Sequence, residues 1–548
     1  MIDETAKQVC ATHDRMKGRR ANWEQHWQEI AERILPSHAI FNTKYLYGGE
    51  KRTHKIFDAT SAFALTRHAA IMESLLTPHT QVWHRLKSPF EELNANLEVQ
   101  EYFHAANRAL FGLRYSSNAG FIAASQEYYI GAGAFGTGAM FVQEVDTAFG
   151  VEFRYISVPL SELFIETDFS GRPIRVVREW ERTASQIVGE FENRRGSSIP
   201  DDLSKAARDD PSRKYTVLHY VAPADEHGGG GRQGFGYVSY YVVKDISATL
   251  SRGGYYSFPY IVGRYMTAPA EDYGRSPAMI ILPDIKMLNE MSRTNIRAAH
   301  RRAEPPILTT EDGSLTRISM QPNALIGGGL DEQGRQKVQP MMTGGDVGIS
   351  LEMMNQRRAM INDAFFITLF QILVETPRMT ATEVIQRAQE KSSLLSPIMG
   401  RQQAEFLGPL IDRELDILER AGALPNMPEV LREAGGQFII EYESPLTRMQ
   451  QAEEVSGVMR TLETVLPVMQ IDPSVADNFD WDETTRILSR GNGAPPTIMR
   501  RVEEVLEIRQ QRAEEQQAQS EAMMAEPVSA AVKNTAQARK FDAEAAAI

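Results

Sequence analysis

The stretch that decides the fold runs from Tyr273 to Pro306 and reads YGRSPAMIILPDIKMLNEMSRTNIRAAHRRAEPP. Ser276 can cap a helix whose first position is Pro277, which is a favoured helix start. Apolar residues then recur at a spacing close to three and four, until a Glu-Pro-Pro sequence ends the run. Pro283 would kink or restart this helix, because proline lacks a backbone N–H. The pattern predicts a long helix that packs along its length against other helices.

On either side of this helix the character of the sequence changes. Residues 139–265 contain short runs rich in β-branched and aromatic residues, and Asp168-Phe169-Ser170-Gly171 is typical of a hairpin turn. Residues 305–343 again have short strand patterns, punctuated by Gly and Pro. A second long helix is expected from Asp346 to about Leu373. The predicted arrangement is therefore a pair of long helices that leave and return to the body, with a small β module at their far end, like a stalk with a tip.

The other segments are mostly helical. Trp23 and Trp27 lie on one stripe of a helix that Pro36 ends, and packing in the core explains this stripe better than a binding face. The predicted fold class is therefore α+β and mainly helical. Further helices are expected at residues 59–76, 99–113, 121–130, 184–192, about 380–420 and from 453 onward.

Composition limits the classes of function. The 548 residues include 72 Asp and Glu against 59 Lys and Arg, which gives a net charge of −13. Proteins that grip nucleic acid non-specifically normally have a basic face, so this charge argues against such a role but not against a protein through which DNA merely passes. Cys10 is the single cysteine, which indicates a reducing compartment. The most apolar stretch, residues 364–374, is too short to span a bilayer, so a soluble protein is expected.

Motifs for catalysis or cofactor binding are weak or missing. Residues 131–136 read GAGAFG and satisfy GxGxxG, but the expected order is helix then strand, the reverse of a dinucleotide-binding turn. A tight helix-to-strand connection is the better interpretation. His79 and His84 lack a nearby third ligand, so a surface or hydrogen-bonding role is favoured over metal binding. There is no P-loop, HExxH, CxxC or GxSxG sequence. We expect no enzyme, and no catalytic, cofactor or metal site.

A basic stripe stands out on the long helix. Arg293, Arg297 and Arg301 recur every four residues, so they share one helical face and repel one another unless acidic groups oppose them. They could form salt bridges to a neighbouring helix, with Glu352 as one candidate partner. Alternatively, they could form a basic band that faces nucleic acid or an acidic partner.

An ordered set of short motifs resembles the head-to-tail connecting (portal) proteins of short-tailed bacteriophages. The resemblance covers roughly residues 15–425, in order and with compatible spacing, whereas the region beyond about Pro445 matches in general character only. The motifs that carry it are Ile34-Leu35-Pro36, Leu76-Thr77-Pro78 followed by Trp83, Phe135-Gly136-Thr137-Gly138, Tyr273-Gly274-Arg275-Ser276-Pro277, and Ala303-Glu304-Pro305-Pro306-Ile307-Leu308.

This resemblance implies a ring, typically of twelve subunits, at one capsid vertex around a channel for double-stranded DNA. The implied location is the virion head–tail junction, after assembly in the cytoplasm of the bacterial host. The implied partners are the packaging terminase, tail adaptor and tail proteins, capsid and scaffold proteins, and DNA in transit, with no membrane insertion. Two alternatives stay open: another virion protein without a DNA channel, and a nucleotide-binding enzyme that uses Gly131 to Gly136.

The resemblance also implies a division of the subunit into an α/β wing, a helical stem, a small α/β clip and a helical C-terminal crown or barrel. The implied boundaries are 1–273 for the wing and N-terminal α/β region, 274–303 for the first stem helix, 304–345 for the clip, 346–370 for the second stem helix, 371–382 for a tunnel loop, 383–444 for a wing helix and closing strand, and 445–548 for the crown or barrel and tail.

Candidate residues follow from these divisions. Arg378 is the expected DNA-near cation, although it could instead pair with Glu375 or with a neighbouring subunit. The DNA-channel candidates are Arg378, Gln371, Glu375, Thr376, Met379, Thr380, Arg293, Arg297 and Arg301. The candidates for docking partners at the clip are Glu304, Glu311, Asp312, Arg317, Asp331 and Arg335.

Overall fold

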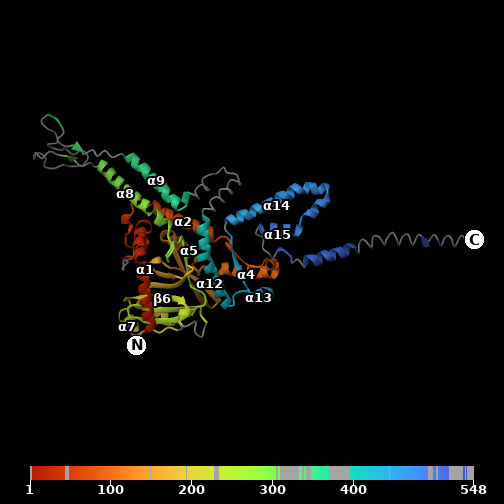
Figure 1. Cartoon of the computed structure of the whole chain (residues 1–548), viewed down its shortest axis with the longest axis horizontal. Coiled ribbons are helices and arrows are strands. Elements are labelled where there is room, and N and C mark those ends of the chain that lie inside the picture. The colour runs from red at the N-terminus through yellow and green to blue at the C-terminus, as the bar shows by residue number, and fades with distance from the viewer. Residues whose placement is uncertain are drawn as a thin grey trace, which may run out of the picture. The chain divides into compact units, whose positions relative to one another are not determined.

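The computed structural model places the chain in two compact units (Figure 1). Unit 1 contains residues Met1–Arg85, Ala106–Pro425 and Ile440–Leu446, and unit 2 contains Leu86–Ala105, Asn426–Ile439 and Thr447–Ile548. The structure describes residues 3–42, 49–148, 150–192, 194, 196–227, 234–303, 307–308, 333–335, 339–340, 347–368, 395–443, 445–491, 498–500, 504–517, 535–536 and 539.

Unit 1 combines helices with two main antiparallel sheets, which confirms the predicted α+β, mainly helical class. Its helices are α1 (Glu4–Ile34), α2 (Thr60–Leu76), α5 (Phe121–Phe135), α6 (Ala184–Phe191), α7 (Asp201–Asp209), α8 (Pro277–Ala303), α9 (Val347–Ala364) and α12 (Gly408–Arg420). Its strands are β2 (Thr137–Thr147), β3 (Gly150–Ser157), β4 (Leu163–Thr167), β5 (Pro173–Thr183), β6 (Lys214–Pro223), β7 (Tyr237–Val243), β8 (Ala248–Tyr255), β9 (Tyr260–Arg264), β10 (Ile307–Leu308) and β11 (Gln339–Pro340).

The two sheets are built from neighbours in sequence. One has the order β3-β2-β9 and the other β4-β5-β6-β7-β8, and every pair within them is antiparallel. Alternate residues of a strand face opposite sides of a sheet. Leu218 and Val242 accordingly pack with the start of α1, whereas Val217 and Val243 pack with α6 and α7. The five-stranded sheet is thus covered by helices on both faces.

The main core of unit 1 forms around the N-terminal helix. Trp27 is fully buried and donates its indole N–H to the carbonyl of Phe135 at 3.2 Å, while its ring contacts Trp23 and Tyr273. Ile30 and Ile34 continue the same buried stripe, so packing rather than binding explains the two tryptophans. The helix ends at Ile34, because Pro36 follows Leu35 and disfavours a helical conformation there.

The GAGAFG segment is the end of a helix and not a phosphate-binding turn. α5 continues through Phe135, Gly136 caps it with φ of +80°, and β2 follows at once. A Cβ at Gly136 would lie 2.2 Å from the carbonyl oxygen of Gly274, so glycine is required there. The helix-then-strand order and the tight connection confirm the structural interpretation of this motif.

A buried ion pair joins distant parts of unit 1. Arg114, at the end of α4 (Leu97–Arg114), pairs with Glu414 on α12, and both side chains are fully buried. Tyr155 donates to Glu414 at 2.6 Å, and His84 bonds to Arg114 at 2.9 Å. His84 therefore has the predicted hydrogen-bonding role, whereas His79 is exposed. Among the described residues, no group of His, Cys, Asp or Glu could hold a metal ion.

Unit 2 is helical in its described parts. Its longest helix, α14 (Pro445–Ile471), starts in unit 1 and exposes several large apolar side chains, among them Leu466 and Ile471. The chain passes between the two units within β1 (His84–Lys87), α4 and β12 (Ile439–Tyr442). The other helices of unit 2 are α3 (Glu91–Ala95), α13 (Glu429–Glu433), α15 (Trp481–Gly491) and residues 504–517.

Several helix boundaries differ from the sequence-based expectation. α9 ends at Ala364 rather than near Leu373, because Phe366 has φ of +59°, which a regular helix cannot contain. α8 continues through Pro283 without restarting, and α7 was not predicted. Short 3-10 helices lie at Pro36–His38, Thr53–Lys55, Leu160–Glu162, Ala224–His227 and Pro473–Asn478, and a π-helical turn lies at Gln403–Leu407. None of the described helices is long and apolar enough to cross a membrane.

Two glycine substitutions test the structural role of the GAGAFG segment. Gly136→Ala should lower the free energy of unfolding by about 2 kcal/mol or more, because it adds strain at positive φ to a backbone clash. Gly131→Ala is the matched control, because its Cβ would meet only ordinary contacts, the nearest at 3.6 Å. Replacing a helical Gly by Ala should leave stability unchanged or raise it by up to about 1 kcal/mol. Urea titrations followed by tryptophan fluorescence measure both, and equal losses would contradict this account.

Candidate functional site: the paired long helices

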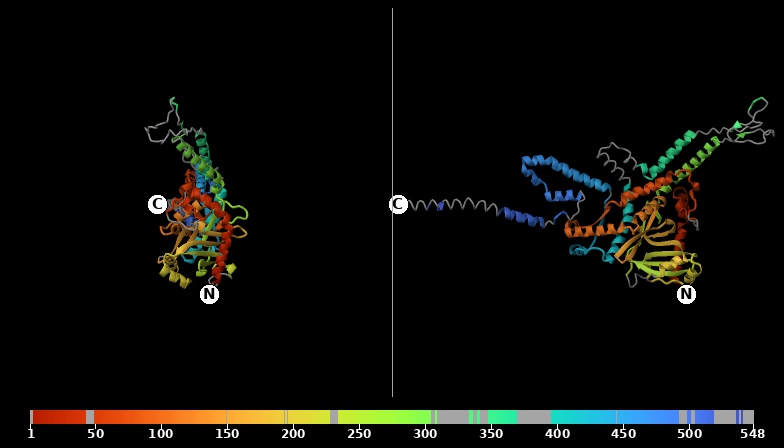
Figure 2. Two further views of the ribbon diagram at one scale, coloured as in Figure 1. Left: turned by 90° about the vertical axis from the view of Figure 1, so that its left-hand side faces the viewer. Right: turned by 180° about the vertical axis from the view of Figure 1, so that it is seen from behind.

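α8 and α9 lie side by side and extend away from the sheets of unit 1 (Figures 1 and 2). Side chains join the two helices at several levels. Arg357 pairs with Asp284, and the hydroxyl of Ser350 donates to Asn295 at 2.8 Å. This arrangement confirms that the chain leaves and returns through two long helices.

The start of α8 is fixed in the core. Ser276 accepts a hydrogen bond from the N–H of Met279 at 3.1 Å, which is the predicted cap. The same hydroxyl donates to the carbonyl of Ala134 at 2.8 Å. Ile285 and Leu288 are buried, whereas Ile296, further along the helix, is exposed. The helix is thus anchored at its first half.

A short loop before α2 clamps the middle of α8. The side-chain oxygen of Asn289 accepts the backbone N–H groups of Phe57 and Asp58 at 2.8 and 3.1 Å. Ser292 donates to the carbonyl of Phe57 at 3.0 Å. Asn289 and Ser292 are polar interruptions in an apolar stripe, because they satisfy backbone groups that would otherwise be buried without partners.

Asp58 connects this loop to the second long helix. Arg358 on α9 donates two hydrogen bonds to one oxygen of Asp58, at 2.7 and 3.1 Å. Thr60 bonds to the other oxygen, with its backbone N–H at 2.9 Å. Burial by itself would raise the pKa of Asp58, but the hydrogen bonds from Thr60 and the charge of Arg358 outweigh it, and the pKa is lowered.

The end of α9 is held by a buried histidine. Phe365 is fully buried, and its carbonyl lies 3.1 Å from Nδ1 of His68 on α2. Burial lowers the pKa of His68 to about 4, against the opposing effect of this hydrogen bond. At neutral pH the ring is therefore uncharged and can donate its Nδ1–H to Phe365. This contact fixes the point from which the chain continues toward residue 369.

The basic stripe is only partly neutralised among the described residues. Arg293 pairs with Glu290 on its own helix at 3.4 Å and lies over the ring of Phe57. Arg297 is exposed and has no ion pair within the described part of the chain. No ion pair to Glu352 occurs among those residues either, so the basic-band interpretation stays open. The backbone of Arg301 is helical and continues α8.

Most other candidate residues lie outside the described residues. Arg335 is described and donates to Gln333, in a short segment between β10 and β11, which pair in antiparallel fashion. This pairing agrees with a small β module between the long helices. The candidates outside the described residues are Gln371, Glu375, Thr376, Arg378, Met379, Thr380, Glu304, Glu311, Asp312, Arg317 and Asp331.

The long helices expose apolar side chains that a lone subunit leaves in water. Such exposed apolar surface commonly marks a contact with another protein. The arrangement therefore suits a contact with another protein. The exposed large apolar residues on this helix pair are Ile280, Met287, Ile296, Leu351, Met353 and Met360.

Comparisons with known proteins identify the family of the chain. A family described as bacteriophage head to tail connecting protein matches residues 6–499. This chain belongs to that family. The chain is 28% identical over 537 residues to the probable portal protein of Bordetella phage BPP-1. The alignment covers 96% of this chain and 94% of that protein. The chain is also 25% identical over 541 residues to the portal protein of Salmonella phage epsilon15, covering 97% and 95%.

This chain is also similar to a solved chain described as the neck of an empty GTA particle computed with C6 symmetry. That match has 11% identity and a TM-score of 0.33, and it covers 77% of this chain and 93% of the other. The likeness is too weak to assign a fold, so the family assignment depends on the sequence matches.

Acid titration tests the clamp at Asp58. A carboxyl whose pKa is lowered by folding stabilises the protein above its unfolded pKa, and this stabilisation is lost as pH falls through the folded value. Asp58→Asn should therefore have a lower free energy of unfolding than wild type at pH 7. Below about pH 4, its free energy of unfolding should fall less steeply with pH than that of wild type. Urea midpoints at several pH values measure this. Asp363→Asn, at an exposed position on α9, is the control. Parallel acid profiles for wild type and Asp58→Asn would contradict the role of Asp58.

Proposed function

We propose that this connecting protein forms a ring-shaped portal at one capsid vertex, through which double-stranded DNA enters the head and later leaves it. The observation that carries the proposal is the family match over residues 6–499, together with two curated relatives, both named as portal proteins, that align over almost their whole length. We propose a structural role rather than an enzymatic one, with twelve subunits as the expected number.

The surface of the long helices supports ring assembly. Ile280 and Leu351 are among the apolar side chains that α8 and α9 leave exposed. A head-to-tail contact repeated around a closed ring covers such surfaces on both sides of every subunit. In unit 2, α14 also exposes large apolar side chains, which supports a helical crown or barrel there.

The charge of the chain supports a conduit. Between low and moderate salt, about 6–10 phosphate contacts change the affinity for DNA by about 10³–10⁵. Several strong contacts from each subunit of a ring would therefore hold the duplex too tightly for it to slide. With 72 Asp and Glu against 59 Lys and Arg, a channel wall that shares the net acidic character of the subunit would repel DNA and let it slide.

The proposed ring assigns a role to each part of the subunit. Residues 1–273 and 383–444 would form the wing, 274–303 and 346–370 the stem, 304–345 the clip, 371–382 the tunnel loop and 445–548 the crown or barrel and tail. In this proposal α8 (Pro277–Ala303) would be the first stem helix and α9, which ends at Ala364, would be part of the second. The clip would dock the terminase during packaging and a tail adaptor afterwards, at the head–tail junction of the virion.

Single-particle electron microscopy with native mass determination tests the proposal. We expect an annular particle, near twelve subunits, with an axial hole wide enough for duplex DNA. A closed assembly without a hole would favour another virion structural protein. A monomer that stays monomeric with scaffold protein present would contradict the portal role.

Arg378 in the proposed tunnel loop provides a test of DNA contact. Arg378→Ala should alter DNA packaging, retention or ejection and should weaken the salt dependence of the affected step, because it removes one positive charge per subunit. Arg208→Ala, on the exposed surface of α7, is a matched control. Glu375→Ala separates a pairing role from a DNA role, because loss of a simple Arg378–Glu375 pair would affect both variants alike. An Arg378→Ala protein with all three processes unchanged would remove Arg378 from the channel.

A further inference from the structure

The backbone is strained at the point where α9 ends. Phe366 has φ of +59°, a left-handed conformation that is an outlier for a bulky side chain. α9 stops at Ala364, and Ile367 and Thr368 are helical again. The helical path is thus interrupted for two residues, Phe365 and Phe366, and then resumes. Strain of this kind persists only where the surrounding structure imposes it, and it is common in segments that switch between conformations.

The amino-acid sequence gives no local reason for this interruption. From Ile349 to Thr376 it contains neither Gly nor Pro, the two residues that most disfavour a helix. The local preference is for a continuous helix, whereas the observed conformation is broken. A conflict between local preference and overall fold means that contacts from elsewhere in the protein decide the conformation.

Contacts with the core favour the break. The carbonyl of Phe365 lies 3.1 Å from Nδ1 of His68, and the ring of His68 stacks near that of Phe366 with the centroids 6.4 Å apart. Phe365 and Ile367 are both buried in the same apolar cluster. Residues two positions apart point to nearly opposite sides of a regular helix. An unbroken helix would therefore bury only one of these two side chains in that cluster.

The broken form and an unbroken form of α9 are close in free energy. The broken form gains the burial of Ile367 and the hydrogen bond of His68. An unbroken form would relieve the left-handed strain at Phe366 and add the helical hydrogen bonds that the break omits. The burial of one aliphatic side chain, one hydrogen bond and one left-handed residue contribute free energies of the same order. Neither form therefore has a large advantage.

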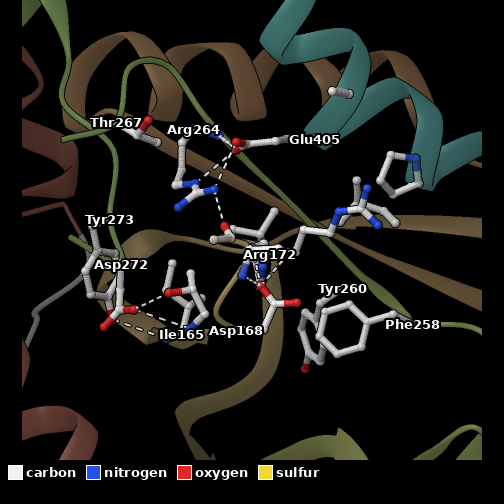
Figure 3. Close-up of a pocket in the computed structure, with 18 of the residues that line it drawn as sticks. Ile165, Asp168, Arg172, Phe258, Tyr260, Arg264, Thr267, Asp272, Tyr273 and Glu405 are labelled. Atoms are coloured by element: carbon white, nitrogen blue, oxygen red, sulfur yellow. Dashed lines mark hydrogen bonds and ion pairs between the residues drawn. The ribbon is translucent and has the colours of Figure 1, made fainter. Parts of the chain in front are cut away.

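The chain downstream of the break is attached to unit 1 more firmly. Arg264, at the end of β9, donates two side-chain hydrogen bonds to Glu405, at 2.9 and 3.0 Å, as Figure 3 shows. The backbone N–H of Arg264 donates to the same carboxylate at 3.0 Å. Tyr265, the next residue, packs against the ring of His68. Neighbouring residues of β9 and its end thus support both attachments, but the attachment at α9 includes a strained residue.

We infer that Phe365 and Phe366 form a two-state joint, in which α9 either stops as observed or runs on through Ile367, and that His68 selects the broken state. The joint is a feature of the subunit itself and goes beyond the proposed function, because it does not depend on a ring. In a ring, the joint would set the direction in which the proposed tunnel loop begins, a few residues later.

The distance between two spin labels reports the state of the joint. The labels are attached to Glu352→Cys and Thr368→Cys, two exposed positions on either side of the break, in the full chain with Cys10→Ser. An unbroken helix places the two Cα atoms about 24 Å apart, and the break changes both the length and the direction of the segment after it. Labelled chain is diluted with unlabelled chain, so that only distances within one subunit are measured. Pulsed electron paramagnetic resonance should show a main component from the broken form and a second component from the unbroken form.

Substitutions should change the ratio of the unbroken to the broken form in opposite directions. Phe366→Gly should lower this ratio by roughly fivefold or more, because glycine adopts positive φ without strain. Phe366→Ala is the matched control, since it also removes the ring but keeps a strained Cβ, and the ratio should rise because alanine favours a helix. His68→Leu should raise the ratio by roughly fivefold, the effect of about one hydrogen bond. Ile367→Ser should raise it by roughly tenfold, because the broken form no longer gains from burying an aliphatic side chain.

Opposite shifts for Phe366→Gly and Phe366→Ala would support the joint, and this pair decides the question even if His68→Leu does not fold. One unchanged distance in wild type and all four variants would overturn the inference, because the break would then be a fixed part of the fold. Equal shifts for the two variants of Phe366 would overturn it as well, since loss of the ring rather than relief of strain would explain them. None of these outcomes affects the proposed ring, which electron microscopy tests separately.

Discussion

The close backbone approach between Gly136 and Gly274 is the constraint on which unit 1 depends. Each residue lies too near the other's backbone for a Cβ. The N–H of Gly274 donates to the hydroxyl of Thr137 at 2.9 Å, and the N–H of Tyr265 donates to the carbonyl of Gly136 at 2.8 Å. One small region thus joins the end of α5, the start of β2, the end of β9 and the segment before α8. This close backbone approach fixes the point from which α8 leaves the body, and the side-chain bonds of Ser276, Asn289 and Ser292 then hold the helix along its first half.

The sequence predicted the elements that have a strong local signal. The cap at Ser276, the end of the first helix before Pro36 and the turn at residues 168–171 each follow from the chemistry of one or two residues. The end of α9 could not be predicted, because the stretch after Ala364 is apolar and has good helical character. A buried contact between His68 and Phe365, 297 positions apart in sequence, accompanies the break at Phe366. Long-range contacts of this kind leave no periodic pattern.

The candidate site was likewise predicted from the sequence only in part. The basic stripe on α8 was visible because Arg293, Arg297 and Arg301 share one spacing. The clamp between Asp58 and Arg358 was not visible in the sequence, because the two residues are 300 positions apart and each is an ordinary charged residue by itself. The family resemblance supplied the proposal of a ring and a channel, which no single motif in the chain specifies.

The bonds between the paired helices and the body of unit 1 have a mechanical consequence. The clamp on α8 involves Asn289 and Ser292, and Arg358 holds α9 close to the same loop, whereas Arg297 and Ile296 are exposed further along. The pair is therefore supported as a cantilever, stiff at its root and compliant toward its free end. A load applied at β10 and β11 would bend the outer turns first and reach the sheets as a torque about the loop at Phe57 and Asp58.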